Sequence, residues 1–173
     1  MDPLSITEIA LRLGCALGLG ALLGLERERK NRPAGFRTMI LISLGSAGFM
    51  LAGQEAITQF ATENGNAHNL TGADISRVLQ GLMGGVGFLG AGAVIQNKRA
   101  VRGLTTAAAV WVTACVGAAC GMGLIKLAAV LAAFALFTLI VLELVENRYF
   151  PEPEDQKGKG EEKKMVDSER IVD

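Results

Sequence analysis

Residues 104–142 read LTTAAAVWVTACVGAACGMGLIKLAAVLAAFALFTLIVL, and this stretch does not fit an ordinary water-soluble domain. Lys126 is its only charged residue. A helix of about 20 apolar residues crosses the roughly 30 Å hydrocarbon core of a bilayer, so the stretch is long enough for two crossings. The residues Gly121-Met122-Gly123 indicate a tight turn between them. We therefore expect spans at about 104–121 and 124–145, with one very long helix as the alternative.

The region without acidic residues extends well beyond this stretch. No Asp or Glu occurs from residue 75 to residue 142, a run of 68 residues, whereas the exposed faces of a soluble domain need charge. Three further apolar stretches, at about 5–25, 39–60 and 78–96, have nearly the length of a membrane span. The predicted fold class is all-α: a polytopic membrane helix bundle of about five transmembrane helices, forming one domain over residues 1–146.

Basic residues predict the orientation of this bundle, because cytoplasmic loops carry an excess of Lys and Arg. The loops after the first and third spans hold eight of them, and the alternate loops hold only Arg77 and Lys126. The N-terminus should therefore face outward and the C-terminus should lie in the cytoplasm. The eight residues are Arg27, Arg29, Lys30, Arg32, Arg37, Lys98, Arg99 and Arg102.

Residues 147–173 alternate acidic and basic side chains and contain few apolar ones. Pro151 and Pro153 discourage any continuation of the last helix into this segment. Such a composition does not bury enough apolar surface to offset the entropy lost on ordering. We expect a charged, disordered cytoplasmic tail.

A dinucleotide-binding fingerprint occurs at Gly85-Val86-Gly87-Phe88-Leu89-Gly90. A site of that kind needs a strand before the glycines and an acidic residue about 20 positions after them. Here the flanking residues are continuously apolar, and no acidic residue follows within 50 positions. We interpret the match as accidental and expect no cofactor.

Glycine makes up half of residues 81–92, and small residues let membrane helices approach one another closely. The first span shows helical glycine pairs at Gly20 and Gly24, and the fourth at Gly117 and Gly121. Tight helix packing is the main interpretation. The alternative is a broken third helix whose free backbone groups line a site. The glycines of the third span are Gly84, Gly85, Gly87, Gly90 and Gly92.

Charged residues inside the predicted spans are costly, and several fall near the outer end. Glu8 and Arg12 are four residues apart on one helix face, so they are able to pair. At about 1.5 Å per residue, Arg12 and Glu55 reach similar depths in the outer leaflet. We hypothesise an Arg12–Glu55 ion pair with Gln54 and Gln80 nearby. The alternative is that each charge extends to the interface alone.

Polar groups also gather where the spans meet the predicted cytoplasmic face. Arginine suits bidentate contact with carboxylate or phosphate, and helix N-termini at Thr38 and Thr105 would direct partial positive charge to the same zone. Topology and lipid headgroups explain basic residues in general, but not the neighbouring threonines and acids. We therefore hypothesise a site for an anion or a partner protein. Its candidate residues are Glu26, Arg27, Arg37, Thr38, Arg102, Thr105 and Thr106.

The sequence shows no pattern typical of an enzyme or a metal centre. His68 is the only histidine, and no nucleophile–base pair is apparent. Cys115 and Cys120 are five residues apart on a predicted helix, so their thiols point to different faces. Together with Cys15 they are interpreted as small buried thiols. We expect no catalytic residue, no metal and no nucleic-acid partner.

Four blocks of the sequence together resemble the MgtC/SapB family of bacterial inner-membrane proteins. They occur in the order and at the spacing of that family, and the resemblance covers about residues 5–145. The blocks are GLERE at 24–28, RPAGFRT at 32–38, GVGFLGAG at 85–92 and VRGLTTAA at 101–108, followed by Trp111.

The resemblance implies an inner-membrane protein of adaptation to low magnesium and, in some pathogens, of intracellular survival. The founding member resembles a regulator of other membrane proteins, including the membrane sector of the ATP synthase, and not a magnesium pump. Members of that type carry a folded cytoplasmic C-terminal domain. This chain is more similar to a short, SapB-like branch, so functions of that domain do not transfer to it.

Two functions are compatible with these observations. The leading hypothesis is a non-enzymatic regulator whose close-packed helices bind other membrane proteins or further copies of the chain. The runner-up is a transporter of a small solute or a cation, with Mg²⁺ among the candidates, built from an oligomer of the bundle. Magnesium in a membrane path favours carboxylate or carbonyl oxygens. No carboxylate is predicted near the middle of the bilayer, which weighs against a dedicated magnesium channel.

Overall fold

The structure, a computed structural model, describes residues 4–63, 72–97, 100–142 and 148. The chain divides into two compact units, residues 1–136 and residues 137–173. The second unit is described only at residues 137–142 and at Arg148, so the predicted tail lies almost entirely outside the described residues. The fold discussed below is that of the first unit.

The all-α prediction is confirmed. Three helices in the described residues, α1, α2 and α4, are long and apolar enough to cross a membrane, and α5 begins a shorter apolar helix. The N-out, C-in orientation remains a prediction. The helices are α1 (Ile6–Arg29), α2 (Phe36–Glu63), α3 (Gly72–Gly92), α4 (Leu104–Gly121) and α5 (Ile125–Phe137), followed by a π-helical segment at Thr138–Leu142.

Large apolar side chains on the helix surfaces agree with a lipid environment. Phe88 of α3 is 80% exposed, and Leu41 and Phe60 of α2 are 69% and 72% exposed. Soluble monomers rarely expose large contiguous apolar patches, whereas in a bilayer the acyl chains cover them. The exposed surface is therefore consistent with helices surrounded by hydrocarbon.

A short β-hairpin connects α3 to α4, and the sequence analysis did not predict it. Strand β1 (Ile95–Asn97) pairs antiparallel with β2 (Ala100–Arg102), with Ile95 opposite Arg102. Gly103 then starts α4 with φ of 91°. A Cβ at Gly103 would overlap the carbonyl oxygen of Ala93, so this turn needs glycine both for its dihedral angle and for space.

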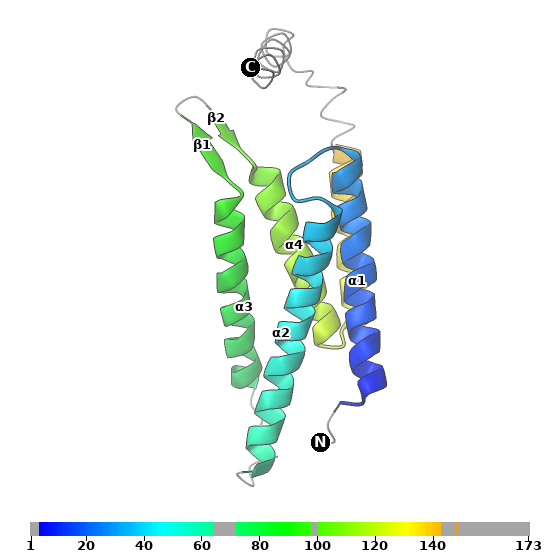
Figure 1. Ribbon diagram of the computed structural model, residues 1–173, viewed down its shortest axis with the longest axis vertical. Helices are drawn as coiled ribbons and strands as arrows, with labels where there is room; N and C mark the ends of the chain where they lie inside the picture. Colours follow the sequence, from blue (N-terminus) through cyan, green and yellow to red (C-terminus); the bar gives the residue numbers. More distant parts are fainter. Residues whose placement is uncertain (1–3, 64–71, 98–99, 143–147, 149–173) are drawn as a thin grey trace, which may run out of the picture. The chain divides into compact units, whose positions relative to one another are not determined.

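The core forms where the backbones of α1, α2 and α4 meet. Figure 1 shows α2 in front of α4, with α1 on one side and α3 on the other. A Cβ added at Gly20 of α1 would lie 2.7 Å from the Cβ of Ser43 on α2, and one added at Gly117 of α4 would overlap the carbonyl oxygen of Ser43. Glycine at both positions therefore lets the three backbones approach closely, as the glycine spacing predicts.

A second glycine on each of these helices extends the same close approach. A Cβ at Gly24 would lie 2.8 Å from the Cα of Phe36, and one at Gly121 would lie 2.5 Å from the carbonyl oxygen of Ala47. The buried hydroxyl of Ser43 donates a 2.7 Å hydrogen bond to the carbonyl oxygen of Ala16. The polar group at the centre of the core is therefore satisfied within the protein, as apolar surroundings require.

The glycines of α3 do not behave as the sequence analysis expected. The helix is continuous from Gly72 to Gly92, so it is not broken at its glycines. A Cβ at Gly90 would stand at an ordinary 3.9 Å from Ala107, and Leu82 and Val86 form the buried side of the helix. Within the described part of one chain, these glycines make no close backbone contact, and their role in packing stays a prediction. The positions where an added Cβ would meet no atom within 4 Å are Gly84, Gly85, Gly87 and Gly92.

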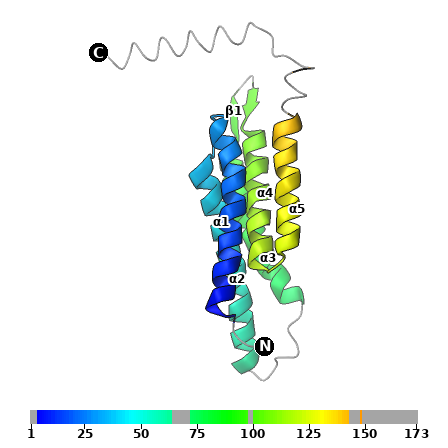
Figure 2. The same cartoon turned by 90° about the vertical axis from the view of Figure 1, so that its right-hand side faces the viewer.

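The predicted turn between the last two spans is present. The amide N–H of Gly123, which has φ of 79°, donates to the carbonyl of Cys120, and the N–H of Leu124 donates to that of Ala119. Figure 2 shows the sequence colours of α4 and α5 progressing in opposite directions on either side of this turn. The chain therefore reverses here, and the alternative of one long helix is wrong.

Substituting alanine for Gly20 should destabilise the bundle by about 1–3 kcal/mol, because the new methyl group must displace Ser43 in a close-packed core. The Gly18→Ala variant is the matched control on the same helix, since a Cβ there meets no atom within 4 Å. It should be neutral or slightly stabilising. Unfolding in detergent, followed by circular dichroism, measures both. Equal stability of the two variants would contradict the proposed core.

Candidate functional site at the basic end of the bundle

Both predicted basic loops lie at one end of the first unit. Figure 1 shows the connection between α1 and α2 at the same end as the hairpin that precedes α4. The opposite end holds the start of α1 and the turn before α5. We call the first of these the basic end, defined by residues 26–38 and 95–106. Of its eight predicted basic residues, Lys98 and Arg99 lie outside the described residues.

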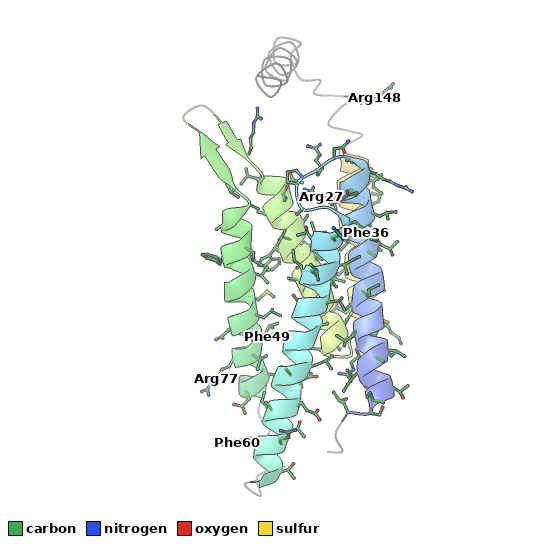
Figure 3. The ribbon with its side chains drawn as sticks, viewed as in Figure 1. Arg27, Phe36, Phe49, Phe60, Arg77 and Arg148 are labelled. Carbon is green, nitrogen blue, oxygen red and sulfur yellow. The ribbon has the colours of Figure 1, made fainter. Side chains whose placement is uncertain are left out.

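Arg27 is the structural centre of the basic end. It lies seven residues after Gly20, two helical turns further along the face of α1 that packs in the core. Its side chain is buried, and the guanidinium donates to the Thr106 hydroxyl of α4 at 2.6 Å and to the Pro33 carbonyl at 3.0 Å. Arg27 therefore ties together α1, the α1–α2 connection and α4, and Figure 3 shows it among these segments.

Glu26 is also buried, next to Arg27 in the sequence. One of its carboxylate oxygens accepts from Lys30 Nζ at 2.8 Å, four residues along α1. The other oxygen, Oε2, has no hydrogen-bond partner in the described part of the chain. An ionised carboxylate removed from water needs a counter-ion, and Lys30 supplies it here. Glu26 and Arg27 therefore both have partners within the chain and lie below its surface.

Glu28 caps the next helix across the connection. Its Oε2 accepts a 3.0 Å hydrogen bond from the backbone N–H of Phe36, the first residue of α2. A negative charge at a helix N-terminus interacts favourably with the helix dipole. A Cβ at Gly35 would overlap the Glu28 carboxylate, so glycine makes room for the cap. The Glu28 carboxylate is thus engaged with the backbone of α2.

A surface pocket of about 620 Å³ opens beside this cap. It brings together the exposed side chains of Arg29 at the end of α1 and Arg37 and Thr38 at the start of α2. Guanidinium groups at such a pocket suit an anionic group with two oxygens, such as a carboxylate or a phosphate. The pocket is lined by Leu25, Glu28, Arg29, Gly35, Phe36, Arg37 and Thr38.

The seven candidate residues thus fall into three groups. Arg37 and Thr38 line the pocket, whereas Glu26, Arg27 and Thr106 are buried beneath the basic end. Arg102 and Thr105 are exposed and do not line the pocket. Sequence analysis did not assign Arg29 or Gly35 to the site. The RPAGFRT block could have indicated Gly35, because it marks a Pro-Ala-Gly connection between two helices, whereas Arg29 lies three residues before that block.

At the opposite end, Arg12 meets Glu8 and Gln54, as the sequence analysis expected, but not Glu55. Its guanidinium pairs with Glu8 at 2.5 Å, donates to the Gly121 carbonyl at 2.9 Å and approaches the Gln54 amide oxygen at 3.4 Å. Among the described residues no ion pair joins Arg12 to Glu55, so that part of the hypothesis is wrong. The Glu8 carboxylate on the same helix is four residues away, and the C-terminal carbonyl of α4 attracts a cation.

These features define a class: a helical membrane protein with a packed three-helix core and an arginine-lined pocket at one end. The family model described as MgtC family matches residues 13–148, and the chain belongs to the MgtC family. The resemblance stated above is therefore confirmed. The chain is a bacterial inner-membrane protein, consistent with its three membrane-length helices. No solved structure matches the chain.

Three relatives illustrate the similarity. The chain is 42% identical to Protein SrpB of Synechococcus elongatus, over 76% of this chain and 72% of that protein. It is 34% identical to the putative magnesium transporter YhiD of Escherichia coli K12, over 83% and 63%. It is 39% identical to Protein MgtC of Brucella abortus, over 76% and 50%. The chain thus spans about two thirds of YhiD and half of that MgtC protein.

The Arg27→Gln variant should lose about 2 kcal/mol of stability, because hydrogen bonds from a buried charged group contribute about 1.5–3 kcal/mol. Arg29→Gln, on the exposed side of the same helical turn, serves as the control and should unfold like the wild type. Chemical unfolding in detergent gives both values. An Arg27→Gln variant as stable as the control would mean that the Thr106 and Pro33 contacts contribute nothing.

A double-mutant cycle tests the contacts of Arg12. We expect a coupling energy of about 0.5 kcal/mol between Arg12→Gln and Glu8→Gln, as for other partly exposed ion pairs. The corresponding cycle with Glu55→Gln should give no coupling, because the described structure joins these two residues by no contact. Coupling to Glu55 and not to Glu8 would restore the hypothesis made from the sequence.

Proposed function

We propose that this protein is a non-enzymatic regulator that acts through other membrane proteins in adaptation to low magnesium. The observation that carries the proposal is the pocket formed by Arg29, Arg37 and Thr38 above the buried Arg27. Membership of the MgtC family and the magnesium-related name of one relative supply the physiological setting. Because the chain spans only part of its relatives, their activities are carried over here as a proposal.

The chemistry of the pocket favours binding. Its arginines present planar guanidinium groups, which bind anions through charge-assisted hydrogen bonds. Its carboxylate, Glu28, holds the Phe36 N–H and so has a structural task. An acidic segment of a partner protein, or the phosphate of a lipid that the partner also contacts, has the charge that such a pocket attracts.

We place the basic end in the cytoplasm, because short cytoplasmic loops of membrane proteins are enriched in Lys and Arg. The pocket would then face the cytoplasmic loops and the juxtamembrane segments of a partner. Further copies of the chain are a second kind of partner in this proposal. The buried contacts of Arg27 hold the α1–α2 connection to α4, so that a ligand would meet arginines on a stiff frame.

Transport is the second candidate, and the printed name of YhiD supports it. The packing of the core limits how it would work. The backbone of α2 at Ser43 is in close contact with glycines of both α1 and α4, which leaves no width for a solute between these helices at that level. A conduction path would therefore have to run elsewhere than between α1, α2 and α4 at that level.

Isolation from native membranes tests the regulator proposal. We expect the wild-type chain to copurify with a membrane protein. The Arg29→Gln/Arg37→Gln double variant should recover at least tenfold less of that protein, because the pocket then lacks its charge. Arg102→Gln is the matched control, since Arg102 is an exposed arginine of the basic end outside the pocket. Both variants should remain folded.

A flux assay separates the two candidate functions. Liposomes that contain only the purified chain should show no more Mg²⁺ uptake than empty liposomes if the protein is a regulator. Saturable Mg²⁺ uptake, unaffected by the double variant, would instead support transport. Undiminished copurification by the double variant would remove the pocket from the proposal.

A further inference from the structure

Two separate faces of the bundle carry glycines that the packing of the chain itself does not explain. Gly84 and Gly87 lie on α3, and Gly14, Gly18 and Gly48 lie on α1 and α2. A Cβ at any of the five would meet no atom within 4 Å. Glycine is the weakest helix former apart from proline, and none of these glycines has positive φ. Neither space within the chain nor backbone conformation therefore accounts for them.

The first face lies on the side of α3 opposite its buried residues. Gln80, Gly84, Gly87 and Ala91 follow at spacings of four, three and four, so they form one stripe along the helix. All four are exposed. Arg77 borders the stripe, and Figure 3 shows its side chain pointing away from the other helices. We call Arg77, Gln80, Gly84 and Gly87 the α3 face.

Two polar side chains on the α3 face lack partners in the part of the chain that is described. Arg77 makes no ion pair there, and the Gln80 amide makes no hydrogen bond. Gln80 lies inside the third apolar stretch (about 78–96), where an unpaired amide is costly and usually meets a partner on another helix, whereas Arg77 lies just before that stretch. The α3 face thus combines room for a close helix contact with an unpaired amide and a positive charge.

The second face lies on α1 and α2. Gly14 and Gly18 are one turn apart on α1, and Gly48 and Glu55 are two turns apart on α2, so each pair shares a side of its helix. Glu55 is half-buried, and within the described residues it forms no ion pair or hydrogen bond. We call these four residues the α1–α2 face. It offers a negative charge where the α3 face offers a positive one.

The two charges lie at the same level of the bundle. A Cβ at Gly53 would be 2.5 Å from Val78 Cγ1, which places these two residues level. Glu55 follows Gly53 by two residues, and Arg77 precedes Val78 by one residue. Because α2 and α3 are antiparallel, both steps lead toward the same end of the bundle. At 1.5 Å per residue their levels differ by about 2 Å.

The glycines of the two faces also match in level. Gly20 is level with Ser43, and Ser43 precedes Gly53 by ten residues on α2. Since α1 and α2 run in opposite directions, the α1 residue level with Gly53 and Val78 lies ten residues before Gly20. Counting along α1 and α3 from that level, Gly14 lies within about 3 Å of the level of Gly84, and Gly18 within about 3 Å of the level of Gly87. In Figure 1, α1 and α3 lie on opposite sides of α2.

From these matches we infer that the α3 face of one copy packs on the α1–α2 face of a second copy, with Arg77 of the first paired to Glu55 of the second. Glycines on both sides permit the helices to approach closely, and the charge pair sets the register. A symmetric contact between two α3 faces would instead place Arg77 beside Arg77. Because the two faces differ, the contact is head-to-tail, and it repeats around a ring if the rotation from copy to copy closes.

Cysteine cross-linking in native membranes tests this contact. In a chain whose own three cysteines are replaced by alanine, the Glu55→Cys/Arg77→Cys variant should form disulfide-linked dimers and higher multiples on mild oxidation. When the Glu55→Cys and Arg77→Cys single variants are coexpressed, each disulfide should join one copy of each, so that only a mixed dimer forms. Each single variant alone should stay monomeric. Dimers from Arg77→Cys alone would show a symmetric α3 contact and overturn the inference, as would monomers from the double-cysteine variant.

Charge reversal provides the second test. Arg77→Glu and Glu55→Arg should each reduce the oligomer recovered in mild detergent at least fivefold, and the two together should restore it. Arg102→Glu, at an exposed arginine of the basic end outside the pocket, is the control and should leave the oligomer intact. Neither reversal should change unfolding of the chain, since neither residue has a partner within its described part. Oligomer loss that the double reversal does not restore would contradict the pairing.

The ring provides a surface for the contact between copies that the proposed function includes, and it rests on the proposed function in that point alone. The two fail separately. A chain that stays monomeric but still copurifies with another membrane protein through Arg29 and Arg37 would overturn the ring and leave the regulator proposal standing. A ring that binds no other protein and supports Mg²⁺ flux would overturn the regulator proposal and leave the ring standing.

Discussion

The structure depends on one close approach, that of the α2 backbone at Ser43 to Gly20 of α1 and Gly117 of α4. In a bilayer the acyl chains are as apolar as leucine, so burying apolar side chains does not by itself hold helices together. Dispersion between closely packed backbones, with the Ser43 hydroxyl satisfied by Ala16, takes that role. The positions of the other described helices and of the pocket follow from this three-helix contact.

The basic end shows how the contact determines a site. Gly24, one turn beyond Gly20, lets Phe36 come close to α1, and only at that separation does Glu28 on α1 reach the first N–H of α2. Arg27, on the same face as Gly20, reaches α4 at Thr106 for the same reason. The pocket arginines are therefore presented by a geometry that is fixed deeper in the bundle, and its electrostatics depend on packing.

Much of this fold could be predicted from sequence, and the failures have a common physical cause. Hydropathy located the helices to within a few residues, except that α3 begins near residue 72 and a hairpin follows it. The level of Arg12 was right, since it meets Gln54, but the partner Glu55 was wrong. Periodicity gives the depth of a residue along a helix, yet not the rotation of that helix about its axis, and contacts depend on both. For the same reason the buried role of Arg27 was not separable from the exposed role of Arg37.

The glycines illustrate the same point at a larger scale. Gly20 and Gly117 have nothing in their sequence spacing that distinguishes them from Gly14 or Gly84, and only the structure separates those with a backbone against them from those with open space. If the second group served flexibility, it would fall at bends, but α3 is regular throughout its glycine-rich half. A regular helix that keeps glycines on an open side, next to an unpaired Gln80, is built for contact with another helix. The described chain supplies no such helix on that side, and the inferred contact with a neighbouring copy would supply one.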